Sequence, residues 1–136
     1  MKFLLAFAAL ALFVQLAAAG TRAHAAVPHR YLAGACNDAQ DLGAFKSHWG
    51  TFQNSVDQCA TGCLGGADCS SSCIQKAIGL TQACATCFGQ GVACVATNCY
   101  WKCLNPASPG CAQCSIQHCE APLLSCAGVP KSDIPM

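Results

Sequence analysis

Cysteine dominates this sequence: fourteen of its 136 residues are cysteines, and every one of them lies at or after Cys36. A hydrophobic leader precedes them, so the thiols are expected to oxidise in the secretory pathway. Because their number is even, the simplest state is seven disulfides with no free thiol. Large apolar side chains are scarce beyond the leader. We therefore expect cross-links, rather than a large apolar core, to stabilise the fold.

Residues 1–19 have the three parts of a secretory signal peptide. A basic start is followed by an apolar run over residues 3–14 and by small residues at 17–19, where cleavage is expected. A second small-residue site at 23–25 is an alternative cleavage position. The apolar run is shorter than a membrane-spanning helix requires, and no second run follows it. The sequence therefore predicts a secreted, extracellular protein without a transmembrane segment.

The chain beyond the leader is expected to form one domain with two extensions. We assign residues 20–35 to a flexible segment, 36–128 to a disulfide-stapled domain and 129–136 to a C-terminal tail. Without the leader, six basic residues balance six acidic ones, and no basic run is present. This balance argues against nucleic acid and against anionic lipid as electrostatic partners.

The cysteine spacing nearly repeats. Residues 59–84 and 99–126 each begin with a C-x3-C-Leu motif, and the two copies are offset by about 40 residues. In both copies an Ile-Gln pair precedes the last cysteine, with ten residues from the isoleucine to that cysteine. The pattern indicates an internal duplication. Four cysteines fall outside the match, namely Cys36, Cys87, Cys94 and Cys119.

Each copy predicts a stapled helical hairpin. A C-x3-C pair places both sulfurs on one face of a helix, one turn apart. The segments 65–68 and 105–110 contain the Gly, Asp, Pro and Ser residues that end one helix and begin the next. Nested disulfides follow from the geometry of a hairpin. The expected bridges join Cys59 with Cys73 and Cys63 with Cys69 in the first hairpin, and Cys99 with Cys114 and Cys103 with Cys111 in the second.

One long amphipathic helix is expected before the first hairpin, with Asn37 or Asp38 as its N-cap. Its apolar residues recur every three or four positions, and Trp49 is expected to pack in the core because it belongs to this stripe. Asp38, Asp41 and Asp68 are interpreted as helix-start residues. The stripe consists of Leu42, Phe45, Trp49, Phe52, Val56, Cys59 and Cys63.

The remaining helices are expected to be shorter, because Gly89, Gly91 and Pro122 interrupt the pattern. Few residues are β-branched, and no run alternates between apolar and polar residues. The fold class is therefore all-α: a small disulfide-rich helical domain built from two related helical hairpins, with an N-terminal amphipathic helix. The shorter helices are placed at about 69–78, 82–88, 92–104 and 111–119, with a last turn near 121–126.

The sequence offers no catalytic motif. It contains no G-x-S-x-G, no H-E-x-x-H and no phosphate-binding loop. Two C-x2-C pairs have the spacing of a zinc site, but the secretory leader favours disulfides over metal. We therefore expect no cofactor, no metal and no enzymatic activity. Isolated histidines are usually solvated, and this is the interpretation for His24, His29, His48 and His118.

The two copies differ most inside their first C-x3-C pair. The first copy has Ala60-Thr61-Gly62 there, and the second has Tyr100-Trp101-Lys102. On a helix whose cysteines face the staple, Trp101 points outward. An outward tryptophan is a natural contact residue, because a flat aromatic ring gives a large contact area at a low entropy cost. The alternative, to which we give equal weight, is that Trp101 packs on the small side chains of the other copy.

The leading hypothesis is a secreted, non-enzymatic interaction module that binds an extracellular glycan or a surface protein through Tyr100, Trp101 and Lys102. One alternative is a secreted effector or defence-type protein that acts on membranes. The near-zero charge disfavours it, because membrane-active peptides are usually basic. A second alternative, a small secreted hydrolase, has no site in the sequence to support it.

Overall fold

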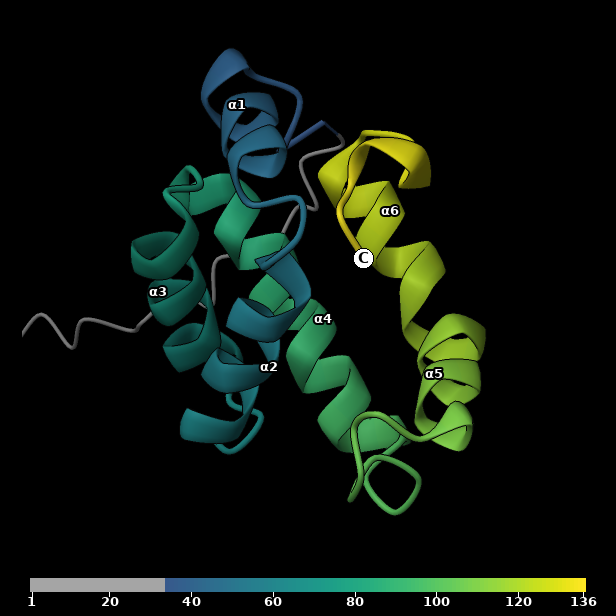
Figure 1. The fold of residues 1–136 in the computed structure, drawn as a ribbon. Coiled ribbons are helices and arrows are strands. Elements are labelled where there is room, and N and C mark those ends of the chain that lie inside the picture. Colours follow the sequence, from purple (N-terminus) through teal and green to yellow (C-terminus); the bar gives the residue numbers. More distant parts are fainter. Residues whose placement is uncertain (1–33) are drawn as a thin grey trace, which may run out of the picture.

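The structure is a computed structural model that describes residues 34–136, so the leader and its cleavage sites lie outside the described residues. The described part of the chain contains helices and no β-strand, which confirms the all-α prediction (Figure 1). The elements in chain order are α1 (Ala39–Ser47), α2 (Phe52–Gly62), α3 (Ala67–Ile78), α4 (Gln82–Asn98), α5 (Pro109–Ser115), a π-helical turn η1 (Ile116–Glu120), α6 (Ala121–Ala127) and a 3-10 turn η2 (Lys131–Asp133).

The expected N-terminal helix is two helices, α1 and α2, separated by a turn. The side chain of Asp38 caps α1 by accepting a hydrogen bond from the backbone N–H of Asp41, as predicted for an N-cap. The chain then turns at 48–51, where Gly50 interrupts the helical pattern. Trp49 lies in this turn and is 56% exposed, so the prediction that it packs in the core is wrong.

The break between α1 and α2 brings two phenylalanines of the core into contact. Phe45 of α1, Phe52 of α2 and Phe88 of α4 contact one another edge to face, with ring centroids 5.1 to 5.9 Å apart. Val129 and Ile134 are buried in the same core, so the residues assigned to a C-terminal tail pack on the domain. A straight helix through residues 47–52 would keep these two phenylalanines on one face but separate them by about 10 Å along its axis, so the turn is what brings their rings into contact.

Helix α4 is the central element. It was expected as two helices, 82–88 and 92–104, but it runs continuously from Gln82 to Asn98. Gly89 does not interrupt it. A Cβ added at Gly89 would lie 2.5 Å from the carbonyl oxygen of Ala67 in α3, so this glycine allows α3 and α4 to approach closely.

Asp41 has a tertiary role that its sequence position did not indicate. Its carboxylate is fully buried and accepts hydrogen bonds from the backbone N–H of Thr81 at 2.7 Å and from the Thr81 hydroxyl at 2.8 Å. The Thr81 hydroxyl in turn caps α4 by accepting a hydrogen bond from the N–H of Cys84. Asp41 therefore joins α1 to the start of α4, and its interpretation as a simple helix-start residue was incomplete.

All fourteen cysteines are paired in seven disulfides. The four nested pairs expected from the spacing are present, and the fifth cysteine of each copy bonds to a cysteine outside the match. The nested pairs are Cys59 with Cys73, Cys63 with Cys69, Cys99 with Cys114 and Cys103 with Cys111. The other three are Cys36 with Cys84, Cys87 with Cys126 and Cys94 with Cys119.

The second copy is less helical than the first. Its first cysteine, Cys99, is the C-cap of α4, and Cys103 lies in a turn, so the prediction of a helix to residue 104 is wrong. The chain has to turn back here, because the bridge holds the Cα atoms of Cys103 and Cys111 4.6 Å apart. From residue 109 the chain forms one rod of α5, η1 and α6, and the wider π turn accommodates Pro122, which lacks an N–H.

The two sides of α4 are stabilised differently. Figure 1 shows α1, α2 and α3 on one side of α4, and the rod of α5, η1 and α6 on the other. The first side contains the phenylalanine core. Around α5 and η1 the buried residues are cysteines, namely Cys99, Cys111, Cys114 and Cys119. Disulfides thus take the place of an apolar core where α5 meets the end of α4.

Candidate functional site

The predicted contact residues Tyr100, Trp101 and Lys102 lie in a tight turn at the end of α4. The backbone N–H groups of Lys102 and Cys103 both donate to the carbonyl oxygen of Cys99, each at 2.9 Å. The Ser108 hydroxyl donates to the carbonyl oxygen of Lys102 at 3.0 Å. Both cysteines that bracket the turn are bonded to α5. Covalent and hydrogen bonds therefore hold the three residues in one conformation.

The side chains of this turn point into solvent. Trp101 is 81% exposed and Tyr100 is 56% exposed, and Lys102 is exposed as well. The alternative in which Trp101 packs on residues 60–62 is therefore not the arrangement in the structure. The two rings meet edge to face, with centroids 5.1 Å apart and planes at 83°. They form a wedge rather than a flat platform, and most of the indole is open to a ligand.

Two exposed leucines extend this surface, and sequence reasoning did not propose them as site residues. Leu64 is 93% exposed and Leu104 is 65% exposed. Each directly follows the second cysteine of the first C-x3-C pair in its copy, so the signal was visible as part of the repeat. A leucine at that position is as compatible with packing as with exposure. Only the tertiary structure distinguishes the two.

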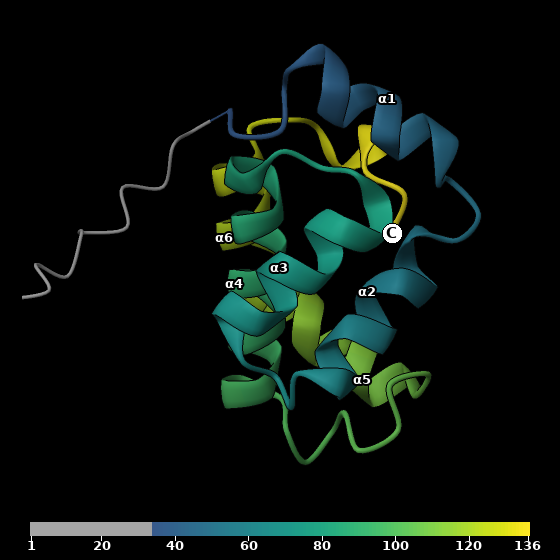
Figure 2. The same ribbon diagram turned by 90° about the vertical axis from the view of Figure 1, so that its left-hand side faces the viewer.

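The loop that carries Leu64 lies against the last part of α4. A Cβ added at Gly65 would lie 2.5 Å from the Cβ of Ala96, so the backbone of this loop contacts α4 closely. Ala96 is one turn before Cys99, after which the Tyr100 turn begins. Figures 1 and 2 accordingly place the α2–α3 loop and the 99–108 loop at the same end of the molecule.

A shallow polar groove of about 410 Å³ lies between α3 and α4. Its hydroxyl groups donate to carbonyl oxygens of their own helices, as Ser71 does to Ala67 at 2.8 Å and Thr97 does to Ala93 at 2.8 Å. They therefore present acceptor lone pairs rather than free protons to the groove. The groove contains no histidine, so none of these hydroxyls has an imidazole base beside it.

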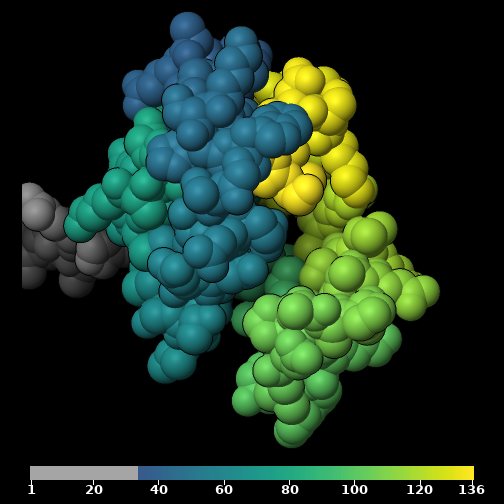
Figure 3. Space-filling view, in the orientation of Figure 1, coloured from purple at the N-terminus to yellow at the C-terminus, as the bar shows by residue number. Residues whose placement is uncertain are grey.

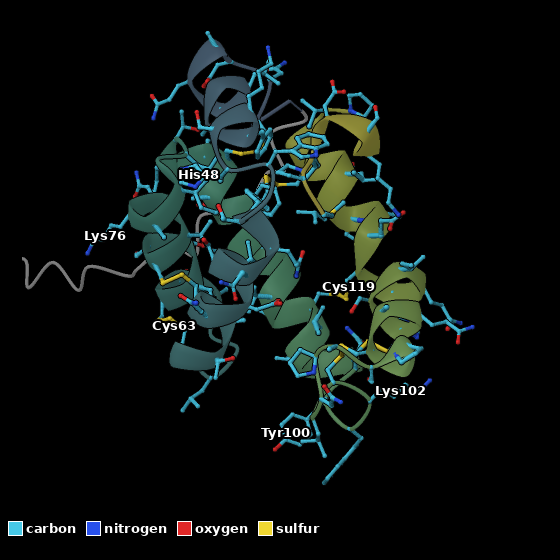
Figure 4. The ribbon with its side chains drawn as sticks, viewed as in Figure 1. His48, Cys63, Lys76, Tyr100, Lys102 and Cys119 are labelled. Carbon is cyan, nitrogen blue, oxygen red and sulfur yellow. A yellow bond between two sulfur atoms is a disulfide. The ribbon has the colours of Figure 1, made fainter. Side chains whose placement is uncertain are left out.

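The titratable groups of the described residues are dispersed. His48 is half-buried at the end of α1, whereas His118 is exposed in η1, and Figure 4 shows His48 far from Tyr100. His24 and His29 lie outside the described residues. Within residues 34–136 no group of three or more His, Cys, Asp or Glu side chains is arranged to hold a metal ion.

The Asp41 carboxyl has a pKa above its ordinary value. Burial raises its pKa, and the hydrogen bonds from Thr81 act in the opposite direction. Asp41 and Thr81 lie at the junction of α1 and α4, and neither lines the polar groove or the Tyr100 turn. The shift therefore concerns stability rather than a reaction.

The Tyr100 turn with its two neighbouring leucines is thus the candidate site. Comparison with protein-family models, with curated proteins and with solved structures finds no match for this chain. Among the helices of residues 34–136, none combines the length and the apolar character needed to span a membrane.

Proposed function

We propose that this protein is a secreted, non-enzymatic interaction module that docks on an extracellular glycan or another component of a cell surface through Tyr100, Trp101 and Lys102. The observation that carries the proposal is an indole that is 81% exposed on a turn held at both ends by disulfides. Seven disulfides in so small a chain are typical of extracellular proteins, which supports secretion.

The rigidity of the turn favours binding. A backbone that is already ordered loses little conformational entropy when a partner covers the turn. Aromatic side chains bury about 150–250 Å² each, so covering Trp101 contributes on the order of a few kcal/mol before the costs of association are subtracted. A site of this size predicts modest affinity for a single ligand and stronger binding to a surface that is contacted at several points.

The ring geometry restricts the kind of surface. Because the planes of Tyr100 and Trp101 are 83° apart, the pair cannot lie flat on a crystalline polysaccharide. The exposed indole is available for stacking, and Lys102 is the adjacent hydrogen-bond donor. The proposal therefore favours a projecting glycan chain or a deformable surface over a flat crystalline one.

The test is a binding assay on insoluble polysaccharides and intact cells with the wild type, Trp101→Ala and Trp49→Ala. Trp49 is the matched control, because it is 56% exposed in a turn beside His48, which Figure 4 places far from Tyr100. We expect Trp101→Ala to lose binding and Trp49→Ala to retain it, with thermal stability unchanged in both. Equal binding by the two variants would remove Trp101 from the site, and with it the proposal.

A further inference from the structure

Exposed apolar side chains extend beyond the three residues of the proposed site. We call the side chains of Leu64, Tyr100, Trp101 and Leu104 the apolar end; they are 93%, 56%, 81% and 65% exposed. Seven large apolar side chains of the described residues are exposed. These four of the seven lie in the two loops at one end of the molecule. Such clustering marks an interaction surface, because single exposed apolar residues are scattered on ordinary surfaces.

The apolar end consists of two separate tips. Leu64 forms the first tip in the α2–α3 loop, and the turn from Tyr100 to Leu104 forms the second after α4. Figure 3 shows a hollow between α2 and the 99–115 segment, and Figure 2 shows both loops at the same end. A small ligand on one tip leaves the other in water, whereas a broad surface contacts both at once.

The backbone of the first tip is fixed by the end of α2. Leu64 has a φ of 51°, and it is the one residue other than glycine with a positive φ in the described chain. This left-handed residue ends α2 in a Schellman motif, in which the N–H of Leu64 donates to the carbonyl oxygen of Thr61 at 3.2 Å and the N–H of Gly65 donates to that of Ala60 at 3.0 Å. The leucine side chain at this position is left in water. The loop is closed by the disulfide of Cys63 with Cys69, which maintains the exposed position. The helix cap and the disulfide therefore fix the backbone of a tip whose apolar side chain is exposed.

The composition of the tips identifies the partner. Leucine neither stacks on a sugar ring nor donates a hydrogen bond, so a glycan leaves Leu64 and Leu104 unused. The interfacial layer of a lipid bilayer suits all five side chains: leucine enters the acyl region, tyrosine and tryptophan lie at headgroup level, and Lys102 extends to water. The balanced charge beyond the leader provides no attraction to anionic lipid. We propose that the apolar end docks on electrically neutral bilayers by inserting both tips.

This inference rests on the proposed function, because it takes the Tyr100 turn to be a docking site and names the surface that it contacts. The experiment uses the chain from residue 20 onward, in its oxidised form, with phosphatidylcholine vesicles and with vesicles in which about a third of the lipid is phosphatidylserine. Co-sedimentation measures the partition coefficient. The variant Trp49→Phe leaves Trp101 as the only tryptophan, so the shift of its emission reports the environment of the second tip.

We expect binding to phosphatidylcholine vesicles, a blue shift of Trp101 emission, and little change with anionic lipid or salt. Leu64→Ser and Trp101→Ala should each lower the partition coefficient about tenfold, the order of magnitude for burying one large apolar side chain. Trp49→Ala should leave it unchanged. Circular dichroism of each variant checks that the fold is retained, which the exposure of the three side chains predicts.

The alternative outcomes separate the two proposals. If vesicles do not bind but glycan or cell binding depends on Trp101, the lipid inference is wrong and the proposed function stands. If no binding depends on Trp101, both are wrong. Binding that requires phosphatidylserine and ignores Leu64 would also overturn the lipid inference. A dimer would overturn it as well. If sedimentation without lipid shows a dimer, and Leu64→Ser dissociates that dimer, the partner is a second copy of the chain.

Discussion

Replacing Gly89 with alanine should force α3 and α4 apart. The added Cβ would lie 2.0 Å from the Ser71 hydroxyl oxygen, 2.5 Å from the Ala67 carbonyl oxygen and 2.8 Å from the Ser71 nitrogen. Two of these three atoms belong to the backbone, so a side-chain rotation cannot remove the clash. The hydroxyl is also engaged, because it donates to the Ala67 carbonyl. One helix therefore has to move relative to the other.

The magnitude follows from two opposing effects. Overpacking a closely packed contact costs about 1–3 kcal/mol and occasionally more. Alanine is favoured over glycine inside a helix by about 1 kcal/mol, which offsets part of this cost. We expect a net loss of up to about 2 kcal/mol in the free energy of unfolding, or up to roughly 15 °C in Tm for a domain of this size.

Gly91→Ala is the matched control, two residues further along the same helix. Its Cβ would lie 3.7 Å from the nearest atom of Leu123, an ordinary van der Waals distance. Only the helix preference then applies, and this variant should be stabilised by about 0.5–1 kcal/mol. Thermal and guanidinium unfolding of the oxidised proteins, followed by circular dichroism, compares the two. If Gly89→Ala is stabilised as much as Gly91→Ala, the close approach of α3 to α4 is refuted.

Three further predictions concern charge, disulfides and redox state. Burial raises the pKa of Asp41 above its ordinary value of 3.8, so the folded protein holds this proton more tightly than the unfolded chain does. The difference in free energy of unfolding between the wild type and Asp41→Asn should therefore shift in favour of the wild type as pH falls from the raised pKa to 3.8, and shift back as pH rises. A difference that is independent of pH would contradict this. Removing the disulfide of Cys94 with Cys119, which spans 25 residues, should lower stability by about 3 kcal/mol. Amide exchange should then accelerate in α5 and η1 and stay slow in α3 and α4, and uniform acceleration would show that the two sides are not stabilised separately. The intact protein should weigh fourteen hydrogens less than the reduced chain, whereas free thiols or bound zinc would contradict the seven bridges.

Features that depend on neighbours in the chain were predictable. The helical class follows from spacing and from the shortage of β-branched residues. The four nested bridges span between 6 and 15 residues, so the geometry of one hairpin decides them. The contrast between the two copies likewise identified Trp101 as unusual. It did not decide whether that side chain packs or projects.

Features that depend on distant segments required the tertiary structure. The bridges of Cys36 with Cys84 and Cys87 with Cys126 span 48 and 39 residues, and no local spacing selects them. Trp49 belongs to the apolar stripe by position, but the helix breaks beside it, and this break brings the rings of Phe45 and Phe52 into contact while Trp49 stays exposed. The carboxylate of Asp41 has the sequence context of a helix start, and its partner is Thr81, 40 residues away.

The sequence by itself thus determined that this protein is a cross-linked bundle of helices, because cysteine spacing and helical periodicity are local properties of the chain. The tertiary structure alone decided which apolar side chains remain in water. Exposure depends on what the rest of the chain leaves uncovered: Leu64 and Trp101 belong to separate copies of the repeat, and only the packing of the α2–α3 loop on α4 brings their loops to one end.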